Sequence, residues 1–137
     1  MNRSDLQKLS TTRIKEAEVL LNNSCYDGAY YLSGYAVECA LKAKIAKETK
    51  KYDFPDFKFI GSVYTHDLST LLVKANLEVL LNQDKKTRPN LGINWNIVSQ
   101  WNEKSRYETN NEHESKKLYQ AITDKRDGVL VWLKKHW

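Results

Sequence analysis

A polar stretch near the end of the chain holds an arginine and a histidine that together could act on a phosphate ester. Arg106 and His113 are separated by six residues in the run RYETNNEH. A guanidinium matches the geometry of phosphate oxygens and stays charged, whereas a histidine ring takes up or releases a proton near neutral pH. The chemistry available to this pair is proton transfer beside a held phosphate. The alternative is that His113 is an exposed residue in the first turn of a helix.

Two further ionisable residues are candidates for a site. One lies within an otherwise apolar helical pattern, and the other lies where a helical pattern begins. Glu38 lies within GYAVECALKA, and Lys42 follows it by one helical turn, so either an i,i+4 ion pair or a binding site explains the carboxylate. His66 opens the run HDLSTLL and is either a binding residue or a residue whose ring contacts the central helix. His136, among lysines near the chain end, is expected to be a cation at a helix C-terminus.

The element that must position these groups is a helix predicted over Tyr26–Lys51. One face of it carries only small residues at spacings of four and three: Ala29, Ser33, Ala36, Ala40 and Ala43. Beside that face lie the bulky apolar residues Leu32, Val37, Leu41 and Ile45. A helix that is apolar over most of its circumference is buried on several sides. We therefore predict a central helix that other helices approach closely.

Four more helices are predicted around it, and no alternating strand pattern or repeat is present. They are expected at about residues 4–22, from Thr65 to about Leu80, at 93–101, and from about Asn110 to the chain end. Val79 and Ile93 are expected on buried faces. Gly128 is expected within the last helix, whose buried residues are Leu118, Ala121, Ile122, Val129, Trp132 and Leu133.

The same patterns predict where helices begin and how one loop is arranged. Ser4 is expected to cap the first helix and Asp27 the central one, and Thr109 with Glu112 has the spacing of a capping box. The run DFPDFKF around Pro55 is predicted to be an extended loop. Its aromatic residues are expected to pack on the core: Phe54, Phe57 and Phe59.

Length, charge and cysteine use limit the class of protein. The 137 residues are expected to form a single domain, 1–137. A net charge of +5 is compatible with binding a polyanion, but lysines gathered at helix ends also complement the helix dipole. No apolar run is long enough to span a bilayer and no secretory signal is present, so we expect no membrane association and a cytoplasmic location.

Cys25 and Cys39 are expected to be reduced and to serve as small apolar side chains that fill space. No metal site or cofactor is expected.

Several motifs taken in order resemble the HEPN domain, a family named for higher eukaryotes and prokaryotes nucleotide-binding. These are AEVLL at the end of the first helix, YDGAYYLSGYAVECALKAKIA, THDLSTLL, and a tryptophan followed by RY. The resemblance covers nearly the whole chain. It implies an all-α, up-and-down bundle of about five helices that commonly forms a homodimer, often encoded beside a minimal nucleotidyltransferase as a toxin–antitoxin pair.

The resemblance also gives the polar stretch a possible function. Many members are metal-independent ribonucleases with an arginine and a histidine four to six residues apart, a pattern that Arg106 and His113 match at its outer limit. Tyr107 departs from the polar residue that many of these members have, and an Arg-Tyr pair also occurs in members without the histidine. Two hypotheses therefore remain: a ribonuclease toxin with Arg106 and His113 as catalytic residues, or a non-catalytic dimeric module that binds a nucleotidyltransferase or a nucleotide. Glu38, His66 and Tyr107 are the candidate binding residues.

Overall fold

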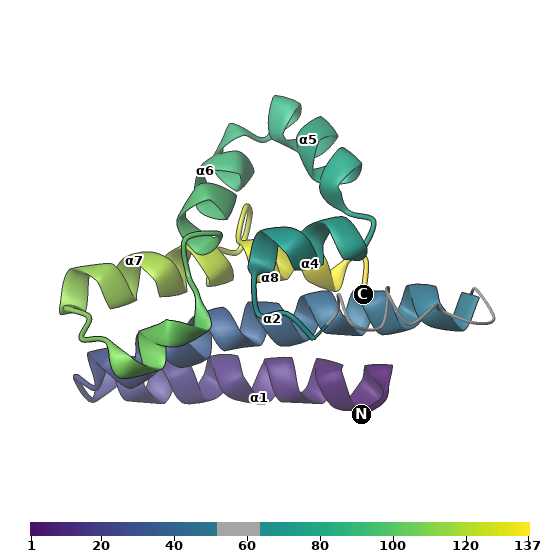
Figure 1. Ribbon diagram of the computed structural model, residues 1–137. Coiled ribbons are helices and arrows are strands. Elements are labelled where there is room, and N and C mark those ends of the chain that lie inside the picture. The colour runs from purple at the N-terminus through teal and green to yellow at the C-terminus, as the bar shows by residue number, and fades with distance from the viewer. Residues whose placement is uncertain (52–63) are drawn as a thin grey trace.

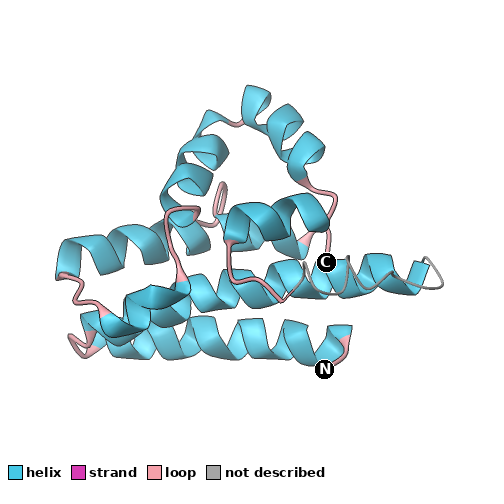
Figure 2. Cartoon of the chain, in the orientation of Figure 1, coloured by secondary structure: helices cyan, strands magenta, loops and turns pink. Residues whose placement is uncertain are grey.

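The computed structural model describes residues 1–51 and 64–137, without the side chains of residues 50 and 51. These residues form seven α-helices and one 3-10 helix and contain no strand (Figures 1 and 2). The elements in order are α1 (Arg3–Asn22), α2 (Tyr26–Lys51), α4 (Leu68–Lys74), α5 (Glu78–Thr87), α6 (Pro89–Val98), η1 (Glu103–Tyr107), α7 (Glu112–Thr123) and α8 (Val129–Lys134). The all-α prediction is confirmed. The helix count exceeds five because two predicted helices are each divided.

Helix α2 is central, as predicted, and its bounds agree with the sequence. It contacts α1, α4, η1, α7 and α8, and α1 lies antiparallel beside all but its C-terminal part (Figure 1). Every member of the predicted small-residue face is fully buried: Ala29, Ser33, Ala36, Ala40 and Ala43. Across the α1–α2 contact, the Ser10 hydroxyl donates to the carbonyl of Ala36 at 2.7 Å. A side chain reaching a helix backbone at that distance shows that the two helices approach closely.

A second close contact joins α2 to the segment that carries Arg106. The indole of Trp101 is buried directly over Gly34, where a Cβ atom would lie 2.3 Å from three ring atoms. The ring of Tyr31 lies 5.9 Å from the indole, and Tyr35 stacks on Tyr31 at 6.0 Å. Glycine at position 34 is therefore required by the indole, and Trp101 fixes the start of η1 against the middle of the molecule.

The predicted helix over residues 65–80 is two helices. The first of them, α4, begins at Leu68 rather than at the predicted Thr65, and Asp67 caps it by accepting a hydrogen bond from the amide of Thr70 at 3.2 Å. The chain turns at Asn76, whose φ of 58° lies in the left-handed region that asparagine tolerates. This turn changes which face of the following helix is buried. Val79 is 69% exposed, so the prediction for it was wrong, and Leu81 takes the buried position.

Helix α6 begins earlier than predicted because Pro89 occupies its first turn, a position where the missing amide costs little. The earlier register buries Leu91, Trp95 and Val98. Ile93 is 56% exposed, so its predicted burial was wrong. Trp101 lies beyond the helix end but is buried as expected.

The predicted last helix is also divided. Asn111 caps α7 by accepting from the amide of Glu114 at 2.8 Å, so the capping box at Thr109 was wrong. Asp124 forms the turn before α8 and accepts from the amide of Asp127 at 2.8 Å. Gly128 is the N-cap of α8 rather than a residue within a helix, and its backbone lies too close to the Asp124 carbonyl for a side chain. The six predicted core residues of this region are all buried.

The beginnings of the first two helices also differ from the sequence prediction. Asn2, not Ser4, caps α1, and Asn2 and Asp5 form a reciprocal capping box. Asp27 lies inside the first turn of α2, and its carboxylate accepts from the amide of Asn110. Asp27 therefore connects α2 to the loop before α7. The predicted loop with Pro55, Phe54, Phe57 and Phe59 lies outside the described residues.

The two chain ends lie at the same end of the bundle (Figure 1). Arg3 donates to the carbonyl of Trp137 at 2.5 Å. The His136 ring packs edge-on against Trp132 at 4.9 Å, and burial lowers the pKa of His136, an effect that nearby lysines reinforce and Asp84 opposes. This lowered pKa disfavours the cation that was expected at His136. No described helix is both long enough and apolar enough to cross a lipid bilayer.

We predict that Gly34→Ala destabilises the protein by about 1–3 kcal/mol, because a methyl group overpacks the contact with Trp101 despite the better helix propensity of alanine. Chemical denaturation measures the free energy of unfolding. Gly28→Ala is the matched control, since its Cβ would meet only the flexible end of Leu20 at 3.1 Å. The cost of Gly34→Ala should shrink in a Trp101→Leu background, and an unchanged cost would contradict the assigned contact.

Candidate functional site

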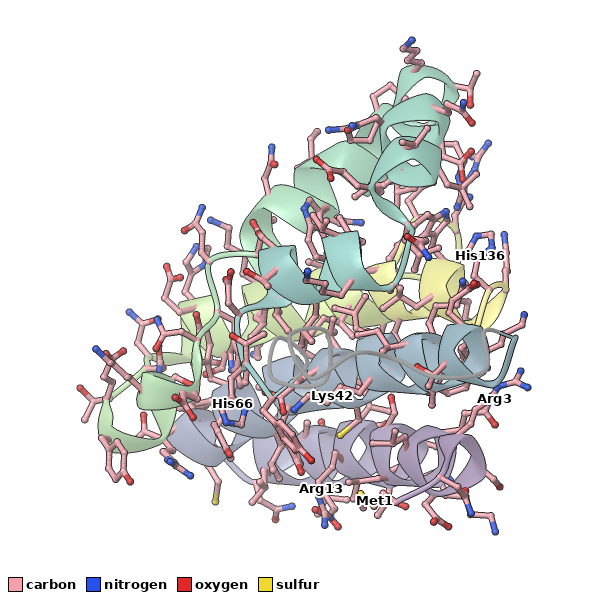
Figure 3. All side chains as sticks on the ribbon, turned by 45° about the vertical axis from the view of Figure 1, so that its right-hand side comes forward. Met1, Arg3, Arg13, Lys42, His66 and His136 are labelled. Atoms are coloured by element: carbon pink, nitrogen blue, oxygen red, sulfur yellow. The ribbon has the colours of Figure 1, made fainter. Side chains whose placement is uncertain are left out.

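A buried carboxylate on α2 anchors the main ionisable cluster. The side chain of Glu38 is 3% exposed, and its two oxygens contact Lys42 Nζ at 3.3 Å and His66 Nδ1 at 2.8 Å. Figure 3 shows His66 and Lys42 side by side along α2. The predicted ion pair with Lys42 is confirmed, and so is the expected contact of the His66 ring with the central helix. A charge this deeply buried requires such partners.

The cluster continues from α2 to η1 through the imidazole ring. His66 Nε2 lies 3.1 Å from Glu103 Oε2, so both ring nitrogens face carboxylates. Only the protonated ring can donate to both. Glu103 Oε2 in turn lies 4.0 Å from Arg106 Nη2. We call Glu38, Lys42, His66, Glu103 and Arg106 the charged network. It links the core helix to the arginine singled out in the sequence.

Arg106 lies at the weak end of this network. Its contact with Glu103 is at the outer limit of an ion pair, and its guanidinium otherwise lies 5.1 Å from the ring centroid of Tyr107. Arg106 is exposed, and Tyr107 is 80% exposed. The contact between Arg106 and Tyr107 is therefore a surface contact and not part of the core. Most guanidinium donors remain accessible to a ligand.

His113 occupies the first turn of α7, as predicted, and is exposed. Within the described part of the chain its ring makes no hydrogen bond or ion pair. It lies at a cleft of about 550 Å³ between α6 and α7, which we call the α6–α7 cleft. The lining residues are Asn90, Asn94, Ile97, His113, Lys116, Lys117, Gln120, Ala121 and Asp124.

The single chain places Arg106 and His113 in different surroundings. Arg106 belongs to the charged network, and His113 to the α6–α7 cleft; no hydrogen bond or ion pair between described residues joins the two side chains. The loop between them is held at its centre, where Asp27 accepts from the amide of Asn110, and Ser115 donates to the carbonyl of Tyr26 at 2.7 Å. The spacing of the two residues in the sequence therefore does not produce a contact within one chain.

Sequence reasoning missed the residues that share the cleft with His113. Lys117 and Gln120 follow His113 at four and seven residues, a spacing that places all three on one face of α7. That polar stripe was readable in the sequence. The contribution of Asn90 and Asn94 was not, because it depends on how α6 packs against α7.

The cleft contains one lysine that is already paired. Lys116 contacts Glu112, and their hydrogen bond lowers the pKa of Glu112 and raises the pKa of Lys116. Lys117 has no such partner among the described residues. Lys117 is therefore the cation of the cleft that is available to a ligand.

The cysteines are both free, and Cys39 is buried as expected, whereas Cys25 is exposed. Cys25 is therefore not the buried filler that the sequence predicted. Burial raises the pKa of the Cys39 thiol to about 11, which keeps it protonated beside Glu38. Across the residues that the structure describes, no group of three or more His, Cys, Asp or Glu side chains is arranged to hold a metal ion.

We predict that a double-mutant cycle on Glu38→Ala and His66→Ala gives a coupling free energy of about 1–3 kcal/mol, since one partner is a buried charge. The cycle on His66→Ala and Glu103→Ala serves as the control. Its two partners are both partly exposed, so that coupling should stay below about 1 kcal/mol. Urea denaturation measures both. Equal coupling energies would show that burial of Glu38 does not dominate the charged network.

Comparison with known proteins gives one match. The family model described as the HEPN domain matches residues 5–136. Neither a curated protein nor a solved structure matches the chain.

Proposed function

Because this chain belongs to the HEPN domain family, we propose that it is a metal-independent endoribonuclease in which Arg106 holds the scissile phosphate and His113 transfers the proton. Membership of the family supports a function on nucleotides or RNA in general. The residues Arg106 and His113 extend that general function to a specific reaction. Their exposure and chemistry, described above, support the assignment.

The observation that carries the proposal is that, within a single chain, neither Arg106 nor His113 is tied up in a close contact. His113 is exposed and, among the described residues, forms no hydrogen bond or ion pair. Arg106 is exposed, and among the described residues its contacts are the 4.0 Å approach to Glu103 and the surface contact with the Tyr107 ring. His113 also lies in the first turn of a 12-residue helix, where backbone amides without helical partners attract a phosphate. Residues with a purely structural role would be expected to have closer partners.

The proposed reaction needs only groups that the chain supplies. The 2′-hydroxyl of RNA attacks the adjacent phosphorus and gives its proton to neutral His113, and the bond to the 5′-oxygen breaks. The proton then passes to the departing 5′-oxygen, which leaves a 2′,3′-cyclic phosphate and a 5′-hydroxyl. Arg106 donates hydrogen bonds to the phosphate oxygens on which negative charge develops.

The proposal includes a homodimer, because Arg106 and His113 do not meet within one chain. In a two-fold symmetric pair, Arg106 of one copy would act beside His113 of the other. The family resemblance further supports a place for the protein as the toxin of a toxin–antitoxin pair, with a minimal nucleotidyltransferase as its partner.

We predict that Arg106→Ala and His113→Ala each lower RNA cleavage by roughly 100-fold or more, the usual cost of losing an oxyanion donor or a general base. Cleavage of a labelled single-stranded RNA in EDTA measures the rate. Arg126→Ala is the matched control, because Arg126 is also exposed. The Arg106→Ala and His113→Ala variants should both keep the wild-type unfolding midpoint. Cleavage at the wild-type rate by the Arg106→Ala/His113→Ala double variant would refute the proposal. If the wild-type protein forms a stable complex with a nucleotidyltransferase but cleaves no RNA, the non-catalytic module is indicated instead.

Mixing the two inactive variants tests whether the site is shared between copies. A dimer of one Arg106→Ala chain and one His113→Ala chain retains one intact site only if the two residues come from different chains. With random exchange, about a quarter of the wild-type activity should return, since about half of the dimers are mixed and each has one of two sites. The absence of any recovery, with mixed dimers confirmed by native mass spectrometry, would place both residues in the same chain.

A further inference from the structure

The α6–α7 cleft begins at His113 but extends well beyond it. Along α7 the lining residues His113, Lys117, Gln120 and Asp124 recur at spacings of four, three and four, which form one continuous stripe. From His113 to Asp124 the helix rises by about 16 Å at ~1.5 Å per residue. Helix α6 packs against α7 (Figure 1) and supplies the other lining residues, Asn90, Asn94 and Ile97. The cleft is therefore a surface feature separate from the charged network that holds Arg106.

The polar groups of the cleft are mostly unengaged. Among the described residues, the side chains of Lys117, Gln120 and Asn90 make no hydrogen bond or ion pair, and all three are exposed. The amide nitrogen of Asn94 donates to the carbonyl of Asp127 at 2.8 Å, which fixes that side chain and leaves its oxygen as an acceptor. Among the described residues the cleft thus offers one unpaired lysine, Lys117, together with amide donors and acceptors.

Charge is distributed unevenly along the cleft. His113 lies in the first turn of α7, and the unpaired Lys117 lies one turn further along, in the first half of the helix. Asp124 lies at the other end, where its carboxylate accepts from the amides of Arg126 and Asp127 at 3.2 Å and 2.8 Å. A negative group is favoured beside Lys117 and opposed beside Asp124. A ligand that fits must be anionic at one end and neutral, with hydrogen-bonding edges, at the other.

We propose that the α6–α7 cleft binds a nucleotide unit, with its phosphate beside Lys117 and its base among Gln120, Asn90 and Asn94. The volume of about 550 Å³ is within the range of small-ligand sites. Amide side chains match the donors and acceptors of a base edge, and Ile97 and Ala121 add apolar surface to the lining, against which the ring can pack. The inference rests on the proposed function in one respect: it places this nucleotide next to the phosphate that is cleaved at His113.

Binding of a 2′-O-methyl RNA oligonucleotide tests the site without cleavage, because this RNA lacks the attacking hydroxyl. Lys117→Gln should weaken binding about tenfold and reduce the slope of log affinity against log salt by about 0.7, the contribution of one phosphate contact on a single strand. Gln120→Ala together with Asn90→Ala should weaken binding but leave that slope unchanged. Fluorescence anisotropy at several salt concentrations measures both quantities.

Lys86→Gln is the matched control, because Lys86 is exposed on α5, does not line the cleft, and changes the net charge equally. Equal weakening by Lys117→Gln and Lys86→Gln would overturn the proposal, as would a wild-type protein that does not bind the oligonucleotide or a mononucleotide. A mononucleotide that competes with the oligonucleotide would identify a free nucleotide as the ligand, whereas binding of the oligonucleotide alone would identify RNA.

The two proposals fail in distinguishable ways. If the wild-type protein cleaves RNA but Lys117→Gln binds as tightly as Lys86→Gln, the nucleotide site is wrong and the ribonuclease stands. If Lys117→Gln alone loses binding but the wild-type protein cleaves no RNA, the ribonuclease is wrong and the nucleotide site stands. Circular dichroism and the unfolding midpoint of each variant exclude a loss of fold as the cause.

Discussion

The close approach of neighbouring elements to α2 is the constraint on which the rest of the structure depends. Along most of its length α2 presents alanine, serine or glycine to its neighbours, so α1 and the Trp101 segment lie against its backbone rather than against long side chains. Close-packed interiors transmit even small changes in volume. The positions of η1 and α7 relative to the core therefore follow from the size of residues such as Gly34, which have no chemistry of their own.

That constraint explains which parts of the molecule the sequence could predict. A pattern of small residues repeated from Ala29 to Ala43, over about four helical turns, is a strong signal, and the helix that carries it, α2, has the predicted bounds. The breaks at Asn76 and at residues 124–128 were missed because apolar spacing continues across each of them in the sequence. Their cause is local: a left-handed asparagine in one case and the Asp124 turn with Gly128 in the other. Burial of Val79 and Ile93 was mispredicted for the same reason, since a break or a shifted start changes the face that follows.

The candidate site shows the same limit. Sequence reasoning singled out Glu38, His66, Arg106 and His113 by residue type. One of its two alternatives for Glu38 was the ion pair with Lys42, and one of its two for His66 was a contact with the central helix; both contacts are present. It grouped Arg106 with His113 by spacing, and the single chain separates them into a charged network and a cleft. Glu103 was not singled out, since its importance comes from the approach of η1 to α2 around Trp101.

The charged network has a graded strength that suits a ligand-binding arginine. At one end Glu38 is buried and held by two partners at 2.8 Å and 3.3 Å, so its interactions are expensive to break. At the other end Glu103 and Arg106 are both partly exposed and 4.0 Å apart, and a pair of that kind contributes at most about 1 kcal/mol. In the proposed reaction a phosphate would replace Glu103 as the partner of Arg106 at little cost, while Trp101, packed on Gly34, keeps η1 in place. The same arginine would be unavailable to RNA if its carboxylate partner were as deeply buried as Glu38.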